Sequence, residues 1–178
     1  MISVWTAASF GYYLIGYQLK YIRGDFFING LVSSSSEIAA YITSGTLLRV
    51  VGIKNTLQFS YLIGFLGMFF LLVTTTDNQI WLSFFILGGK FGISQAFLVA
   101  FVAMSVLFPA SISSTSFGIC NVFSRIATVL APFVAELKPE SKSQIIFLIV
   151  VGISFIMGFF LTVIKEEKPT KELKQIDT

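Results

Sequence analysis

The sequence predicts an all-α polytopic membrane protein with six transmembrane helices. Hydrophobic residues make up 55% of the chain and charged residues only 12%, whereas soluble domains carry about 25% charged residues. The apolar residues gather in six runs, each of which reaches the roughly 20 residues that a helix needs to cross a bilayer. Because backbone polar groups in lipid must be satisfied within their own segment, these runs are expected to be helices.

Short polar breaks define where each predicted span begins and ends. The six spans are residues 2–21, 25–48, 56–75, 80–107, 114–135 and 144–164. The first span ends where Lys20 and Gly24 interrupt it, and the second ends at a break that contains Arg49, Gly52 and Lys54. Charged residues and glycine at these positions are typical of loops.

The last three spans are bounded in the same way. A polar break at 76–79 precedes the fourth span, and a proline-led elbow at 109–113 separates it from the fifth. Pro139 lies in the charged break before the sixth span, which is followed by the polar sequence KEEKPTKELKQIDT. Residues 1–164 are therefore expected to form a six-helix transmembrane domain, and residues 165–178 a solvated tail.

Six spans place both termini of this integral, multi-pass chain on the same side of the membrane. Of the lysines and arginines at the span ends, in the breaks and in the tail, six fall on that side and four on the other. The positive-inside rule therefore favours cytosolic termini, with the tail in the cytosol.

The composition excludes most enzyme and cofactor chemistry. The chain has no histidine, which removes Ser–His and Cys–His nucleophilic pairs and histidine-based metal sites. Asp25 and Asp77 fall at segment edges, so they do not suggest an intramembrane aspartyl pair, and the single Cys120 excludes an intrachain disulfide. No catalytic residue, metal site or cofactor is expected. The net charge of +3 lies mostly in breaks and tail, so no nucleic-acid patch is expected either.

Four of the six spans carry small or polar side chains on one helix face, because residues three and four apart share a face. The clearest stripe is in the second span and consists of Asn29, Ser33, Ser36, Glu37, Ala40 and Ser44. Two interpretations are open: the small residues pack helices closely, or the stripes line an aqueous path. The third and sixth spans are apolar nearly all round, so they are expected to face lipid or packing partners.

Glu37, Lys90 and Arg125 stand out because each lies inside an apolar run. A charge at the bilayer centre costs about 2.5–3.5 kcal/mol on insertion scales, so such residues usually face protein or a water-filled cavity. One interpretation is a structural ion pair among them, and the other is a role in a solute path. The three glycines around Lys90 permit close approach of a neighbouring helix, or bending.

Five segments of the chain form a recognisable series: GDFFINGLVSSSSEIAAY, LLRVVGIK, GGKFGISQAF, LFP and FGICNVFSRIATVLAPF. In this order, over roughly residues 5–164, they resemble the second half of an organic cation/anion transporter of the major facilitator superfamily. The resemblance identifies the six spans with helices seven to twelve, so the chain would be one half of that fold. Helices nine and twelve are peripheral in the family, in keeping with the two all-apolar spans.

The resemblance implies a substrate-binding site. Its residues are Tyr12, Tyr13, Glu37, Tyr41, Lys90, Phe97 and Arg125. The tyrosine pair matches paired tyrosines of helix seven, the glutamate an acid of helix eight, and the lysine and phenylalanine a Gly-Lys motif and a cavity aromatic of helix ten. Tyr41 stands where anion carriers can place a lysine, and Lys90 either pairs with Glu37 or contacts the solute. Arg125 matches a basic position of helix eleven that is associated with anionic substrates, which favours an organic anion or a zwitterion.

The resemblance also implies a cytosolic gate at Arg49, Gly52 and Lys54. Of the family's Asp-Arg-x-Gly-Arg-Arg signature after helix eight, the chain keeps the glycine and the last cation. Two charges that oppose this signature in the family are replaced by Val106 and Ser113. The charge latch that closes the family's cytosolic face is therefore incomplete.

The function implied by the resemblance is alternating-access transport of a small organic solute across the plasma membrane. The family has twelve helices, with the site between two six-helix halves, so a second half is implied. It would come from the same longer chain, a partner chain or a second copy. The alternative is a truncated or non-transporting membrane subunit of the same fold. The missing half and the incomplete latch support this alternative. The implied partners are the lipid bilayer and a small-molecule solute.

Overall fold

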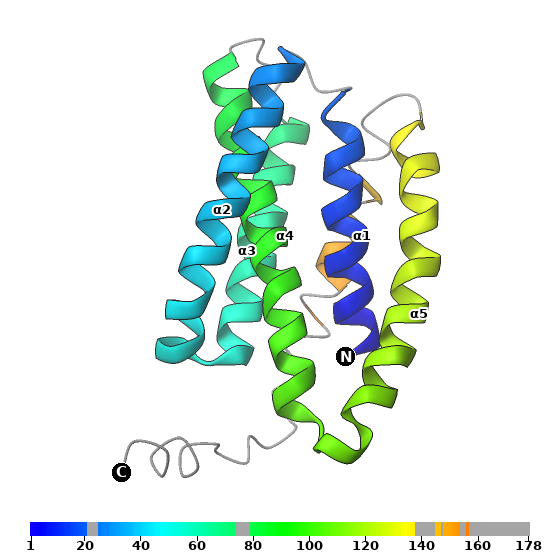
Figure 1. Cartoon of the computed structure of the whole chain (residues 1–178). Coiled ribbons are helices and arrows are strands. Elements are labelled where there is room, and N and C mark those ends of the chain that lie inside the picture. Colours follow the sequence, from blue (N-terminus) through cyan, green and yellow to red (C-terminus); the bar gives the residue numbers. More distant parts are fainter. Residues whose placement is uncertain (21–24, 74–78, 138–144, 147, 154–155, 157–178) are drawn as a thin grey trace.

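The computed structural model describes residues 1–20, 25–73, 79–137, 145–146, 148–153 and 156, and long helices build it (Figure 1). The helices are α1 (Ile2–Gln18), α2 (Phe26–Val51), α3 (Ile53–Val73), α4 (Gln79–Leu107) and α5 (Ala110–Ala135). The described residues beyond position 144 are helical as well, and no strand occurs in the described part of the chain. The predicted all-α fold is confirmed.

Among the described residues, three helices are long and apolar enough to cross a membrane. They cover Ile53–Val73, Ser83–Val106 and Ser111–Ala135, within the third, fourth and fifth predicted spans or close to them. α1 has only 17 residues, and four consecutive serines followed by Glu37 make α2 more polar. The arrangement of six spans stays a prediction. The tail at 165–178 and much of the span at 144–164 lie outside the described residues.

The connection between α2 and α3 is the single residue Gly52, shorter than the break predicted at 49–55. Gly52 has φ +87° and ψ 163°, a region of backbone space that is essentially limited to glycine. Its carbonyl oxygen accepts hydrogen bonds from the backbone N–H and the hydroxyl of Thr56, at 3.1 and 2.7 Å. Glycine therefore lets the chain reverse direction here without a loop.

Replacing Gly52 by alanine is expected to lower the free energy of unfolding by about 1–3 kcal/mol, because a Cβ is strained at this φ and ψ. The measurement is chemical unfolding in mixed detergent micelles. Gly45→Ala is the matched control, since Gly45 lies inside α2 and an added Cβ would meet no atom within 4 Å. An equal effect of the two variants would contradict the assigned strain.

α5 begins at Ala110, inside the elbow predicted at 109–113. The carbonyl oxygen of Pro109 accepts hydrogen bonds from the backbone N–H groups of Ile112 and Ser113, at 3.0 and 2.9 Å. The polar residues of the elbow thus extend the helix, because their backbone groups bond along the chain. The break between α4 and α5 is correspondingly shorter than predicted.

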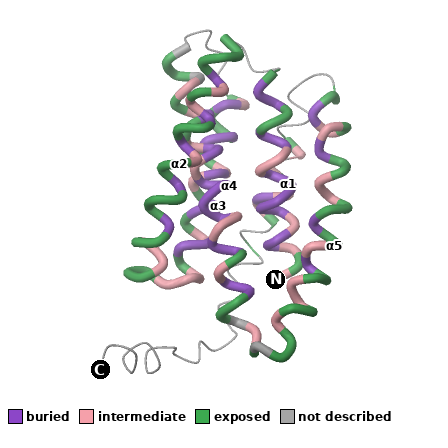
Figure 2. The backbone as a smooth tube through the Cα atoms, in the orientation of Figure 1, coloured by how far each residue is buried: buried purple, intermediate pink, exposed green. Residues whose placement is uncertain are grey.

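The helices form two groups that meet along α1 and α4 (Figure 1). α4 packs against α2 and α3, α1 packs against α5, and the contact between α1 and α4 joins the groups. Figure 2 shows that α1 and α4 are buried over much of their length, whereas α2 and α5 present long exposed faces. Large apolar side chains such as Phe27 and Phe133 are prominent on these exposed faces. This is the distribution expected where lipid or another protein covers a helix.

The stripe of small and polar residues on α2 is mainly a packing face. Its members Asn29, Ser33, Ser36, Ala40 and Ser44 are all buried, and α2 packs chiefly against α4. The Ser36 hydroxyl donates to the carbonyl oxygen of Ser33 at 2.7 Å, and the Ser44 hydroxyl to that of Tyr41 at 3.0 Å. These hydroxyls are thus satisfied within their own helix. Of the two interpretations of the stripe, close helix packing therefore fits these serines, and an aqueous path does not.

Glycines bring α3 and α4 into close contact. A Cβ added at Gly92 would lie 2.5 Å from the Ser60 carbonyl oxygen and would overlap the backbone nitrogen of Gly64. A Cβ added at Gly67 would overlap the backbone nitrogen of Gly89. The predicted close helix approach beside Lys90 is confirmed, with α3 as the neighbour.

Candidate functional site

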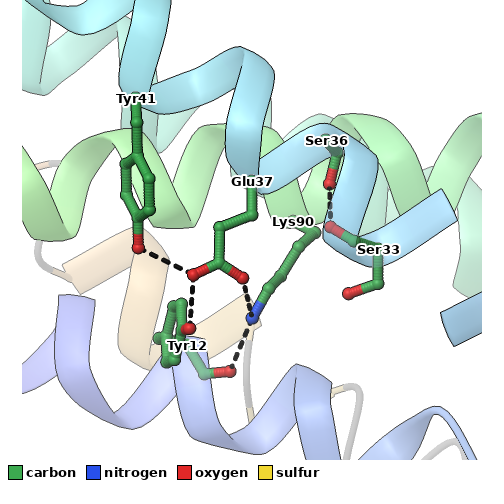
Figure 3. Close-up of polar contacts among 6 residues, drawn as sticks. All are labelled: Tyr12, Ser33, Ser36, Glu37, Tyr41 and Lys90. Atoms are coloured by element: carbon green, nitrogen blue, oxygen red, sulfur yellow. Dashed lines mark hydrogen bonds and ion pairs between the residues drawn. The ribbon is translucent and has the colours of Figure 1, made fainter. Parts of the chain in front are cut away.

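Glu37 is the centre of a polar cluster to which three helices contribute (Figure 3). Its Oε1 atom accepts hydrogen bonds from the hydroxyls of Tyr12 on α1, at 2.5 Å, and of Tyr41 on α2, at 2.7 Å. Its Oε2 atom lies 3.8 Å from Nζ of Lys90 on α4. Four of the seven predicted binding residues therefore meet at one carboxylate.

Lys90 is held on several sides. Its Nζ atom lies 3.5 Å from the centre of the Tyr12 ring, a cation–π contact, and donates to the Tyr12 carbonyl oxygen at 3.5 Å. Only 6% of its side chain is exposed, against 23% for Glu37. A charge so deeply buried is tolerated when it is paired and hydrogen-bonded. Of the two predicted roles for Lys90, the geometry matches pairing with Glu37.

Helix periodicity explains the Glu37–Tyr41 part of this cluster, and helix packing explains the rest. Glu37 and Tyr41 are four residues apart on α2, so they lie on one face of that helix. The buried stripe of α2 turns this side of the helix toward α4, where Lys90 lies. α1 crosses next to α4 and supplies Tyr12 from the other group of helices.

Aromatic side chains extend the cluster along α1 and α4. The ring of Tyr12 stacks on Phe97 with centroids 5.4 Å apart. Phe97 in turn contacts Phe101, and both lie near Trp5, whose ring is 4.3 Å from that of Phe101 and 5.1 Å from that of Phe117. One end of the site is therefore polar and the other aromatic.

The sequence reasoning did not include Trp5 or Phe117 in the site. A signal for Trp5 was present, because it lies seven residues, or two helical turns, before Tyr12 and thus shares its face. Phe117 offered no such signal, since it comes from α5 and its position depends on how that helix packs on α1.

Arg125 lies apart from the Glu37–Lys90 pair. Its Nη1 atom donates to the hydroxyl of Tyr13 at 3.4 Å, and the Tyr13 ring meets the Tyr12 ring edge-on with centroids 5.5 Å apart. The arginine is exposed, and no ion pair to it occurs among the described residues. All seven predicted binding residues are thus linked in one series of contacts, but the two cations are placed differently: one is buried and paired, the other open.

The predicted gate residues lie together and away from this cluster. Arg49 is exposed in the last turn of α2 and Lys54 half-buried in the first turn of α3, on either side of Gly52. The α2–α3 and α4–α5 connections lie at the same end of the bundle as the amino terminus (Figure 1). Val106 and Ser113 flank the second of these connections. A cytosolic gate at this end stays a prediction.

A hollow of the described structure lies elsewhere. It has a volume of about 940 Å³ and opens between the first turns of α1, the first half of α5 and residues near Val150. Its walls include Met1, Thr6, Phe108 and Cys120, and no charged side chain or predicted binding residue lines it. The chemistry therefore directs attention to the Glu37 cluster and not to the hollow. Within the described residues, no group of cysteines and carboxylates could hold a metal ion.

Comparison with known proteins supports the resemblance that the motifs indicated. No family model matches the sequence. The chain is 24% identical to organic cation/carnitine transporter 2 from Homo sapiens over 132 residues, 74% of the chain and 24% of that protein. It is 29% identical to solute carrier family 22 member 4 from Mus musculus over 147 residues, 79% of the chain and 26% of that protein.

A third relative covers more of the chain. Solute carrier family 22 member 13 from Homo sapiens is 25% identical over 163 residues, 92% of the chain and 29% of that protein. The predicted similarity to organic cation/anion transporters is confirmed, and these relatives are carriers and not enzymes. The chain spans about a quarter of the length of the curated relatives that it matches.

Proposed function

We propose that this chain is part of a secondary carrier that moves a small organic solute, with an organic anion as the favoured class, across the plasma membrane. It would act by alternating access as one six-helix half of a major facilitator fold, with both termini in the cytosol. Its similarity to solute carriers of family 22 supports the transport function, and its polar cluster supports the location of the site.

The observation that carries the proposal is the contrast between Lys90 and Arg125, the two cations that lie inside apolar runs. Glu37 neutralises the charge of Lys90, so the pair presents no net charge to a bound solute. Arg125 is exposed and contacts only a neutral hydroxyl at 3.4 Å among the described residues. A guanidinium with free donors binds a carboxylate through two parallel hydrogen bonds. The site as a whole is therefore suited to an anion, with the aromatic rings beside it suited to an apolar body.

A second six-helix half would complete the site. The exposed faces of α2 and α5 carry much apolar surface, and Arg125 and Tyr41 lie on the exposed side of those helices. A carrier binds its solute between two halves of this kind. The second half would belong to the same longer chain, a partner chain or a second copy.

Replacing Arg125 by alanine is expected to reduce uptake of radiolabelled benzoate by about 10- to 100-fold. The reason is that a hydrogen bond between charged groups contributes about 1.5–3 kcal/mol. Uptake would be measured in cells that express the chain together with its second half, with surface biotinylation to verify membrane insertion. Arg125→Lys keeps the charge but loses the planar fork, so an intermediate loss is expected. Undiminished uptake by Arg125→Ala would refute the site assignment.

A second candidate function is a non-transporting membrane subunit of the same fold. Val106 and Ser113 favour it, because they stand where the resembled family has latch charges. Purification from membranes under mild detergent distinguishes the candidates. A stoichiometric six-helix partner, or a chain of twelve helices, supports the carrier, whereas a solitary six-helix species that does not take up benzoate supports the second candidate.

A further inference from the structure

We propose that Tyr41 is a specificity-determining residue, which withholds the Glu37 carboxylate from cationic solutes by occupying it with its own hydroxyl. The proposal rests on the proposed carrier function and explains why a site that contains a carboxylate would still disfavour cations. It concerns Tyr41 alone, and its test is separate from the test of Arg125.

The carboxylate of Glu37 has little capacity left for a solute. Its Oε1 atom accepts two hydroxyl hydrogens, from Tyr12 and Tyr41, and its Oε2 atom faces Lys90. An ionised carboxylate offers about four lone-pair positions in all. Figure 3 shows the two tyrosine hydroxyls converging on the same oxygen from different helices. A cationic solute would have to displace one of these donors to bind there.

Of the two tyrosines, Tyr41 is the one that a solute would meet. Tyr12 is fixed by its stack on Phe97 and by Lys90 over its ring. Tyr41 is 40% exposed, and no aromatic ring packs on it in the described part of the chain. Tyr41 therefore covers the carboxylate from the accessible side.

The hydrogen bond by which Tyr41 occupies the carboxylate lies within α2 alone. Glu37 and Tyr41 are four residues apart on one helix, so their contact does not depend on how the other helices are placed. Tyr12 and Lys90, by contrast, reach the carboxylate from α1 and α4. If α1 and α4 shift during transport, the bond from Tyr41 to Glu37 can persist, so cations stay excluded in each state.

The test compares two probes with the same ring and opposite charge, benzoate and benzylammonium. Their affinities are measured by calorimetry on the chain assembled with its second half in lipid nanodiscs. Tyr41→Phe removes only the hydroxyl and frees one position on Oε1. Benzylammonium is then expected to bind about tenfold more tightly than to the wild type, because its ammonium hydrogen-bonds the freed carboxylate oxygen. The readout is the ratio of the benzylammonium affinity to the benzoate affinity, which is expected to rise about tenfold because benzoate carries no cation to take the freed position.

Tyr17→Phe is the matched control. Tyr17 is an exposed tyrosine of α1, 43% accessible, and its hydroxyl has no partner among the described residues, so both affinities should stay at the wild-type values. The unfolding midpoint of Tyr41→Phe is measured alongside, and Tyr41→Leu provides a second hydroxyl-free variant if the first is not recovered folded.

The outcomes separate this proposal from the carrier itself. Unchanged benzylammonium affinity in Tyr41→Phe and Tyr41→Leu overturns the role of Tyr41, while benzoate binding that Arg125→Ala abolishes leaves the carrier site standing. Wild-type chain that binds benzylammonium as tightly as Tyr41→Phe also overturns it. If neither probe binds any variant, both the role of Tyr41 and the proposed site are refuted.

Discussion

Glu37→Gln is expected to lower the free energy of unfolding by about 3–5 kcal/mol, because it leaves the buried ammonium of Lys90 without its carboxylate. The side chain of Lys90 is only 6% exposed, so water replaces little of the lost interaction. Glutamine keeps the size of the side chain and still accepts the hydroxyl hydrogens of Tyr12 and Tyr41. The expected loss is therefore electrostatic and not a loss of packing.

Removing the other charge of the pair, with Lys90→Met, is expected to lower the free energy of unfolding by less. Lys90→Met leaves a carboxylate that is 23% exposed and that keeps two hydroxyl donors. The double variant Glu37→Gln with Lys90→Met removes both charges and should recover most of the stability, since neutral residues of similar volume can replace a buried ion pair. A double-mutant cycle in mixed detergent micelles measures the coupling.

The chain provides an exposed ion pair as the control. Lys20 and Glu136 lie 3.6 Å apart with side chains 50% and 64% exposed, and such pairs contribute about 0–1 kcal/mol. Glu136→Gln should accordingly change the free energy of unfolding by less than about 1 kcal/mol. Equal effects of Glu37→Gln and Glu136→Gln would show that burial of the inner pair does not govern its energetics.

Gly67→Ala and Gly92→Ala are expected to destabilise the chain by about 3 kcal/mol each, at the upper end of the usual cost of overpacking. The new methyl group would meet the backbone of the facing helix at both positions, on Gly89 in one case and on Gly64 and Ser60 in the other. Backbone atoms cannot rotate aside as a side chain can, so α3 and α4 must separate. The measurement is the free energy of unfolding, with size-exclusion chromatography to detect misfolded species.

Two other glycines provide the control for this prediction. A Cβ at Gly89 would meet mainly the flexible side chain of Met68, at 3.3 Å, and one at Gly118 would meet no atom within 4 Å. Gly89→Ala and Gly118→Ala should therefore cost less than about 1 kcal/mol, because a flexible side chain can give way. The contrast between Gly67 and Gly89 is informative, since both belong to the same helix crossing. Similar losses for both would contradict a contact limited by the backbone.

The helices were predictable because their causes are local. Apolar runs, glycine and charge placed α3 and α4 within a few residues of their observed bounds. The errors fell at Gly52 and Pro109, where residues typical of loops turned out to continue or abut helices. In both cases backbone hydrogen bonds across one turn decided the boundary, and composition does not reveal them.

The polar residues show a different limit. Ser33, Ser36 and Ser44 had the spacing of a solute path, yet they are buried against a neighbouring helix. A stripe of small hydroxyl residues suits a packing face and a wet face equally well on one helix. Only the position of α4 separates the two possibilities.

The sequence by itself determined that this chain is helical and apolar, that its few internal charges are Glu37, Lys90 and Arg125, and which transporter family its motifs resemble. The tertiary structure decided which charges meet. It pairs Lys90 with Glu37 beneath two tyrosine hydroxyls and leaves Arg125 exposed beside Tyr13. The physical reason is distance along the chain: Tyr12, Glu37 and Lys90 are separated by 25 and more residues, so their contact depends on the packing of α1, α2 and α4, which no local pattern encodes.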